Sequence, residues 1–165
     1  MTQKMLVLQL GSNLGKRSRN LHQACFMIEE SIGPINSVSS IYETEPWGYD
    51  SKNSFLNQCI TVGSDMDAGR ILGRILQIEA KLGRKGGSVD YIDRLIDIDI
   101  LFYGDMILSH PDLQIPHSKI QDRRFSLVPL AEILPDFEHP ILRKKISTLL
   151  SECMDTGKVK RIDTD

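Results

Sequence analysis

Hydrophobic residues near the start of the chain change from one spacing to another. Residues 5–10 form an almost continuous apolar run, which predicts a short strand, and the glycines of the loop 11–15 end it. Apolar side chains then recur at the spacing of a helix with one buried face: Leu21, Ala24, Cys25, Ile28 and Ile32. Glycine and proline at 33–34 stop this helix, so the first unit is a strand followed by a helix.

The middle of the chain repeats this change of spacing. Residues 35–43 and 55–63 are rich in β-forming side chains and predict two strands joined by a long connection, a feature that is often functional. Asp67 can cap a second helix, and Gly83 is its expected end. The apolar side of that helix is formed by five residues: Ile71, Leu72, Ile75, Ile78 and Leu82.

Two aspartates alternate with aliphatic residues in the run 94–103. In a strand Asp97 and Asp99 share one face, roughly 7 Å apart. Like charges this close, flanked by leucines, repel each other and lose hydration, so a cation normally compensates them. Mg²⁺ suits such oxygen ligands. The opposite face would hold Ile96, Ile98, Ile100 and Phe102. The alternative is an exposed edge strand with two solvated aspartates.

The order of these elements is β-α-β-β-α-β. It predicts a ferredoxin-like α+β fold, in which two helices cover one face of an antiparallel sheet. A loop-rich, partly helical C-terminal extension follows, and we expect a single domain that spans residues 1–165.

Composition narrows the classes of function. The chain has 165 residues, a net charge of −2 and a pI of about 6.1, which does not suggest the broad basic surface of a nucleic-acid binder. Its apolar runs are too short to span a membrane, and the first residues lead into a strand instead of a signal peptide, so we expect a cytoplasmic protein. The cysteines are odd in number and widely spaced, and we expect them to be small core residues: Cys25, Cys59 and Cys153.

Several motifs occur together in an order and at a spacing that resemble one enzyme family. They are LGSNLG at 10–15, TEPWG at 44–48, FLN at 55–57, RLIDID at 94–99, IPH at 115–117, DRRF at 122–125 and PLAEILP at 129–135. The chain resembles the 6-hydroxymethyl-7,8-dihydropterin pyrophosphokinases of folate biosynthesis. These enzymes transfer pyrophosphate from ATP to a pterin alcohol and release AMP.

The resemblance implies a nucleotide and metal site. Asp97 and Asp99 would hold two Mg²⁺ ions that bridge the ATP phosphates, which agrees with the strand argument above. Arg84 and Arg94 match catalytic arginines that also contact ATP. The remaining positions that match ATP contacts are Ile100, His117 and Arg123. Taken alone, each of these arginines would be an ordinary surface charge and the histidine a structural residue.

The resemblance also implies a pterin site. Phe55 and Phe125 match a pair of rings that stack on the pterin, and Asn57 matches the amide that reads its polar edge. Thr44, Glu45 and Trp47 match residues of the pocket wall. Without the resemblance, both phenylalanines would be taken as core residues.

The chain departs from the family pattern at several positions. Many members have a basic loop where this chain has the glycine-rich segment 84–93. We expect this segment, with part of the loop 45–54, to close over the substrates. Asp112 stands where an arginine often binds phosphate, and Ser118 replaces a common tyrosine. The sequence therefore predicts fewer cations around ATP than in relatives.

Two other functions remain open. A non-catalytic ferredoxin-like module, such as an RNA-recognition domain, has the same order of elements. Its central strands carry aromatic and basic residues, whereas the predicted strand 55–63 here has neither beyond Phe55. Another Mg²⁺-dependent nucleotidyl or glycosyl transferase would also use paired aspartates. We expect a monomer that acts on ATP and a pterin, without nucleic acid or membrane partners.

Overall fold

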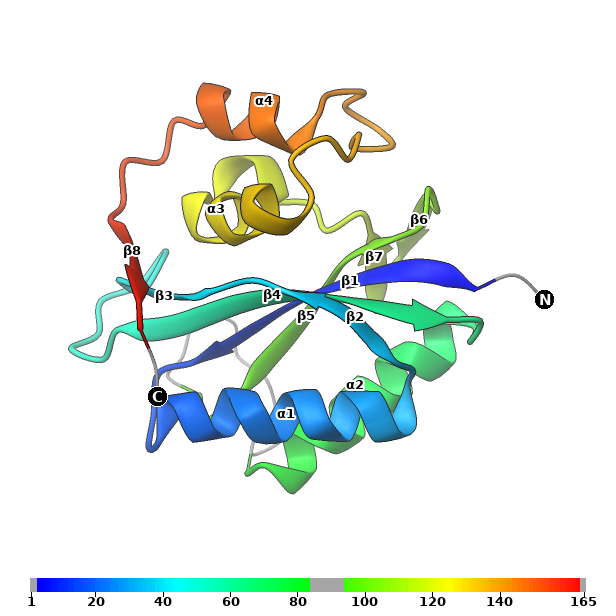
Figure 1. Ribbon diagram of the computed structural model, residues 1–165, viewed down its shortest axis with the longest axis horizontal. Helices are drawn as coiled ribbons and strands as arrows, with labels where there is room; N and C mark the ends of the chain where they lie inside the picture. Colours follow the sequence, from blue (N-terminus) through cyan, green and yellow to red (C-terminus); the bar gives the residue numbers. More distant parts are fainter. Residues whose placement is uncertain (1–2, 84–93, 164–165) are drawn as a thin grey trace.

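A six-stranded antiparallel sheet forms the centre of the computed structural model, which describes residues 3–83 and 94–163 (Figure 1). The strand order is β5-β1-β4-β3-β8, and β2 also pairs with β4. The strands are β1 (Lys4–Ser12), β2 (Ile35–Val38), β3 (Ile41–Thr44), β4 (Phe55–Ser64), β5 (Asp97–Tyr103) and β8 (Val159–Ile162). A separate hairpin consists of β6 (Leu108–His110) and β7 (Leu113–Ile115).

Helices cover both faces of the sheet (Figure 1). The predicted helices α1 (Arg17–Ser31) and α2 (Ala68–Lys81) lie on one face, which confirms the ferredoxin-like arrangement. The C-terminal extension supplies α3 (Arg124–Ile133) and α4 (Ile146–Glu152), which lie on the other face and are preceded by the short 3-10 helix η1 (Ile120–Asp122). None of the helices in the described residues is long and apolar enough to cross a membrane.

Each face of the sheet has its own hydrophobic core. The first core packs the buried side of α1 and α2 against the sheet, including Leu21, Ile28 and Ile75, as the helical spacing predicts. The second packs α3 and α4 against the opposite face, and Cys59 is part of it. All three cysteines are free, as predicted, but only Cys59 is buried, and Cys25 and Cys153 are partly buried beside the two cores. Asp67 occupies the N-cap position of α2 but makes no side-chain capping bond, so that detail of the prediction is wrong.

The predicted strand 35–43 is two strands in the structure. Both β2 and β3 pair with β4, but the chain is interrupted at Ser39 and Ser40. There the Ser39 hydroxyl accepts a 2.9 Å hydrogen bond from the Cys59 amide, where a regular ladder would offer a backbone carbonyl. A side-chain bond therefore breaks the strand that the β-propensity of the sequence predicts as continuous.

A β-bulge changes the faces of β5. Val7 pairs with Phe102, whereas the next residue of β1, Leu8, pairs with Ile100, so Leu101 is an extra residue on β5. Phe102 consequently lies in the α3/α4 core, and Tyr103 takes its place on the α1/α2 face. The prediction that Phe102 shares a face with Ile96, Ile98 and Ile100 is wrong, because strict alternation ends at the bulge.

Candidate active site

Two rows of paired residues run across the centre of the sheet. Gly11 of β1 pairs with Asn57 of β4 on one side and with Asp97 of β5 on the other. Two residues earlier, Gln9 pairs with Cys59 and Asp99 in the same way. Paired residues point to the same face, and Cys59 belongs to the core under α3. The predicted amide and the predicted metal ligands therefore project from the α3/α4 face of adjoining strands.

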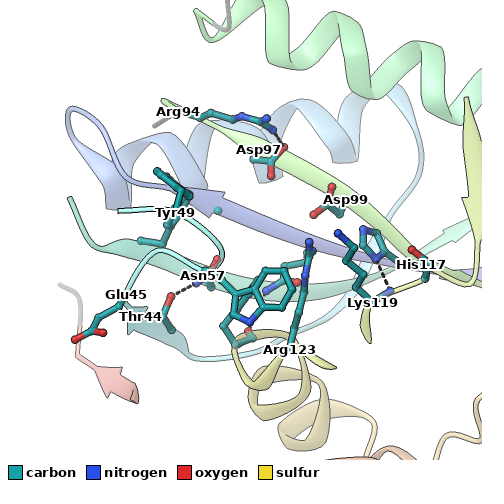
Figure 2. A pocket seen from close by; sticks show the side chains of 16 residues that line it. Thr44, Glu45, Tyr49, Asn57, Arg94, Asp97, Asp99, His117, Lys119 and Arg123 are labelled. Carbon is teal, nitrogen blue, oxygen red and sulfur yellow. Dashed lines mark hydrogen bonds and ion pairs between the residues drawn. The ribbon is translucent and has the colours of Figure 1, made fainter. Parts of the chain in front are cut away.

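A cavity of about 290 Å³ opens over these rows (Figure 2). It brings together every described residue that the resemblance assigns to the site except Ile100, and it adds five further residues. The lining residues are Gln9, Gly11, Thr44, Glu45, Trp47, Tyr49, Phe55, Asn57, Arg94, Asp97, Asp99, His117, Ser118, Lys119, Arg123 and Phe125. Segments far apart in the sequence thus meet at one place.

Two positions named from the resemblance do not line the cavity, and a third is not described by the structure. Arg84 lies outside the described residues, as does the whole segment 84–93 that was expected to close over the substrates. The Ile100 side chain packs in the core under α1 and α2. Asp112 is exposed beyond the hairpin strand β6, and its side chain does not line the cavity. The resemblance alone does not show which of the matched positions line the cavity.

Asp97 and Asp99 form an acidic pair on one wall of the cavity. Arg94 donates a 2.7 Å hydrogen bond to the Asp97 carboxylate. The Asp99 side chain is partly buried and lines the cavity. Burial, and then repulsion from Asp97, raise the pKa of Asp99 to about 8, against the opposing charges of Arg123 and Arg94. The pair therefore favours additional positive charge.

The donor set fits a hard divalent cation. Within residues 3–83 and 94–163, no group of three or more histidine, cysteine, aspartate or glutamate side chains is arranged to hold a metal ion. Two carboxylates without further protein ligands suit Mg²⁺, which keeps several waters and takes phosphate oxygens from a substrate. Asp97 and Asp99 could hold such an ion only together with water or a ligand of this kind.

Asn13 positions the start of this acidic strand. Its side-chain oxygen accepts a 2.6 Å hydrogen bond from the backbone amide of Arg94, and its backbone amide donates a 3.0 Å hydrogen bond to the Arg94 carbonyl. The Asn13 side-chain nitrogen donates to the Asn53 carbonyl and to the Tyr49 hydroxyl, each at 3.2 Å. The loop after β1 is therefore joined to both β5 and the loop that carries Tyr49. In the sequence Asn13 predicts only a turn, which is why this role was missed.

His117 is a neutral group in the cavity wall. Its Nδ1 accepts a 3.2 Å hydrogen bond from the Lys119 amide, so in the neutral ring Nε2 carries the proton. Burial, followed by the charge of Arg123, lowers the pKa of His117 to about 4, although Asp97 acts in the opposite direction. His117 can consequently act as a neutral hydrogen-bond donor at physiological pH.

Aromatic rings and cations form the opposite wall. The rings of Trp47 and Phe125 meet edge to face, with centroids 6.4 Å apart. The Arg123 guanidinium lies 4.8 Å from the Trp47 ring centroid and 5.4 Å from that of Phe125. Phe55 and Phe125 are only partly buried and both line the cavity, so they are not the core residues that the sequence alone would favour.

A buried amide lies beside these rings. Asn57 is 3% exposed and donates a 2.6 Å bond to the Thr44 hydroxyl. Its side-chain oxygen lies against Gly11, where an added Cβ would be only 2.9 Å from it. Glycine at this position therefore preserves the space in which Asn57 can present a donor and an acceptor. Glu45, which the resemblance places in the pocket wall, is exposed at the rim of the cavity (Figure 2).

Comparisons with known proteins point to one family. A sequence model of the family described as "7,8-dihydro-6-hydroxymethylpterin-pyrophosphokinase (HPPK)" matches residues 7–135. A Porphyromonas gingivalis protein named 2-amino-4-hydroxy-6-hydroxymethyldihydropteridine pyrophosphokinase is 38% identical over 139 residues, which cover 82% of this chain and 94% of that protein. Proteins with the same name from Aquifex aeolicus and Bacillus subtilis are 34% and 36% identical, over 88% and 79% of this chain and 89% and 78% of their own lengths.

Solved structures agree in fold. A Plasmodium falciparum HPPK-DHPS crystal structure with pteroate superposes with a TM-score of 0.75 over 91% of this chain, at 18% sequence identity. This chain spans 42% of the length of that larger protein. At such identity the similarity concerns the fold alone.

Proposed function

The chain belongs to the 7,8-dihydro-6-hydroxymethylpterin-pyrophosphokinase family, and we propose how the residues around its cavity carry out the family reaction. The enzyme transfers pyrophosphate from ATP to 6-hydroxymethyl-7,8-dihydropterin, a step of folate biosynthesis. The hydroxymethyl oxygen forms a bond to the β-phosphorus as the bond to the α,β-bridging oxygen breaks. AMP leaves, and the hydroxyl proton is lost.

The pterin would lie between the two partly buried phenylalanine rings. Phe55 and Phe125 present flat apolar surfaces to the cavity, and the edge of Trp47 closes the side. Asn57, held by Thr44, would pair with the donor and acceptor groups of the pterin edge. A ring with a different edge would leave this buried amide unpaired, which is the physical source of selectivity. Glu45 at the rim would contact the part of the substrate nearest to solvent.

The phosphates would lie along the acidic strand. Two Mg²⁺ ions bound by Asp97 and Asp99 would neutralise phosphate charge and align the β-phosphorus with the attacking oxygen. Arg94 keeps Asp97 oriented through its 2.7 Å bond, while Asn13 holds the Arg94 backbone. These contacts fix the Asp97 carboxylate before ATP arrives, so little reorganisation of this group is needed in the transition state.

Two further groups would hold the nucleotide. Neutral His117 can donate from Nε2 to a phosphate or ribose oxygen without adding charge. Arg123 can offer several donors to phosphate oxygens from its place beside Trp47. The contacts assigned to Arg84 and Ile100 remain predictions from the resemblance.

One observation carries this proposal: Asn57 of the proposed pterin site and Asp97 of the proposed phosphate site lie in one row of paired residues across three strands. Gly11 separates Asn57 from Asp97, and two strand spacings amount to roughly 10 Å. A bicyclic pterin whose polar edge meets Asn57 therefore extends its hydroxymethyl group toward the acidic strand. Gly11 adds no side chain between them, so the ring and the phosphates can approach each other.

The reaction products test the function directly. Purified protein is incubated with ATP, 6-hydroxymethyl-7,8-dihydropterin and Mg²⁺, and the products are separated by chromatography. Equal amounts of AMP and pterin diphosphate are expected, with no turnover in excess EDTA. ADP with a pterin monophosphate would indicate an ordinary kinase, and inorganic pyrophosphate with an adenylylated pterin would indicate a nucleotidyl transferase. Either result would contradict the assignment.

A non-catalytic RNA-binding module is disfavoured by the architecture. Such modules present an open sheet face to RNA, whereas α1 and α2 cover one face here and α3 and α4 the other (Figure 1). We also propose that the enzyme acts as a monomer in the cytoplasm and that residues 1–165 form one domain. Light scattering during gel filtration would test the monomeric state.

A further inference from the structure

Lys119 belongs to the wall of the cavity, although neither the motifs nor the fold assign it a role. It lies between β7 and η1, next to Ser118 and two residues after His117. Its backbone amide bonds the His117 ring, and its half-buried side chain lines the cavity. Figure 2 shows Lys119 and Arg123 reaching from the same side toward Asp99.

Trp47 lies close to both cations. The Lys119 ammonium is 5.7 Å from the Trp47 ring centroid, and the Arg123 guanidinium is 4.8 Å from it. Cation–π contacts of this kind are weaker than charge-assisted hydrogen bonds to phosphate oxygens. A phosphate that enters the cavity therefore competes favourably with the indole for both cations.

The charge of the site calls for a cation here. A triphosphate would lie beside the carboxylates of Asp97 and Asp99, so positive charge in the cavity is needed to offset their repulsion. Lys119 places a positive charge inside the cavity, beside His117 and opposite the acidic strand.

We propose that Lys119 is a further phosphate-binding residue, one that leaves the Trp47 ring to bond the β- or γ-phosphate of ATP. The proposal rests on the proposed function, since it assumes that ATP occupies this cavity. A terminal phosphate is the expected partner because Lys119 faces the same space as Asp99 and Arg123.

Binding measurements with matched nucleotides test the proposal. Lys119→Met keeps the length of the side chain but removes the charge. It should weaken binding of the Mg²⁺ complex of a non-hydrolysable ATP analogue by about tenfold. Binding of AMP, which lacks the terminal phosphates, should stay unchanged, and Lys119→Arg should restore most of the affinity. Lys145→Met is the control, because Lys145 is 60% exposed, contacts Asp136 and does not line the cavity.

The single tryptophan provides a second readout. Trp47 is the only tryptophan in the sequence, so its fluorescence reports on the ring that both cations contact. The ATP analogue should change the emission of the wild type as the cations leave the ring, and Lys119→Met should reduce this change. Lys145→Met should respond as the wild type does.

Two results would overturn the proposal. One is unchanged affinity of Lys119→Met for the ATP analogue, and the other is an equal loss of affinity for AMP and the analogue. Failure of the proposed function would look different, because the wild type itself would then form no AMP from ATP and the pterin. Thermal unfolding of all variants distinguishes a local effect from loss of the fold.

Discussion

The side-chain amide of Gln9 donates a 3.0 Å hydrogen bond to the backbone carbonyl of Phe125, 116 positions later in the sequence. The Ser126 hydroxyl donates to the oxygen of the same amide. Gln9 is 3% exposed and pairs with Asp99 across the strands. One buried side chain thus connects the acidic strand with the first turn of α3, where a ring of the proposed pterin site lies.

Replacing Gln9 by leucine should therefore impair pterin binding. Both hydrogen bonds are lost, and the Phe125 carbonyl and Ser126 hydroxyl are left unpaired, which should destabilise the fold by about 1–3 kcal/mol. The displaced Phe125 should weaken pterin binding several-fold, as measured by calorimetry at saturating ATP analogue. Gln58→Leu is the control, because Gln58 donates a similar 3.0 Å bond to the Ser39 carbonyl away from the cavity. Equal losses of pterin affinity in the two variants would contradict a positioning role.

Asp97→Asn and Asp99→Asn should each reduce turnover by about 100-fold or more, because each substitution removes a charge from the proposed metal site. Folding should be little affected, since asparagine preserves the shape. Asp99→Asn should even unfold at a slightly higher temperature in EDTA, because burial and repulsion disfavour the Asp99 charge. Steady-state kinetics and thermal unfolding measure the two effects. Near-normal turnover of Asp97→Asn would refute the metal assignment.

Asn57→Ala should weaken pterin binding by about 1–3 kcal/mol, since it removes the amide that we propose pairs with the ring edge. Binding of the ATP analogue should be largely unchanged, because the proposed phosphate site lies across Gly11 on the Asp97 side of the row. Calorimetry with each ligand separates these outcomes. An equal loss for both ligands would mean that Asn57 supports the structure instead of reading the pterin.

Gly11→Ala should also weaken pterin binding, although it adds only one methyl group. The new Cβ would lie 2.9 Å from the Asn57 side-chain oxygen, so that amide must shift, and it would also contact the Phe55 ring at 3.4 Å. Gly73→Ala is the matched control, because no atom lies within 4 Å of a Cβ at that exposed position of α2. It should leave pterin binding unchanged and stabilise the helix by up to about 1 kcal/mol.

His117 should make the stability of the protein depend on pH in a definite direction. Its pKa is about 4 in the folded protein, below the ordinary value of 6.5, so the unfolded chain binds more protons between these values. The stabilising contribution is fully present above about pH 6.5 and is lost as the pH falls through 4. His117→Gln should therefore lose less stability than the wild type between pH 7 and pH 4.5, measured by urea unfolding in EDTA. Identical losses would show that the buried imidazole does not contribute.

The spacing of apolar and acidic residues along the sequence was sufficient to predict most of the fold and part of the site. Helical periods placed the buried sides of α1 and α2, and alternation in the run around Asp97 and Asp99 placed both carboxylates on one face. These features depend on neighbours a few residues apart, so the local sequence determines them. The matching motifs then identified most of the residues that line the cavity.

Only the tertiary structure decided how these segments meet. The bulge at Leu101, the row from Asn57 through Gly11 to Asp97, and the bond from Gln9 to Phe125 all join distant parts of the chain. Such contacts depend on strand register and on the packing of α3 against the sheet. Register and packing result from the interactions of many residues along the chain, and no short sequence pattern contains all of them. For the same reason Lys119, an ordinary charge in the sequence, is identified as a cavity residue only after the chain has folded.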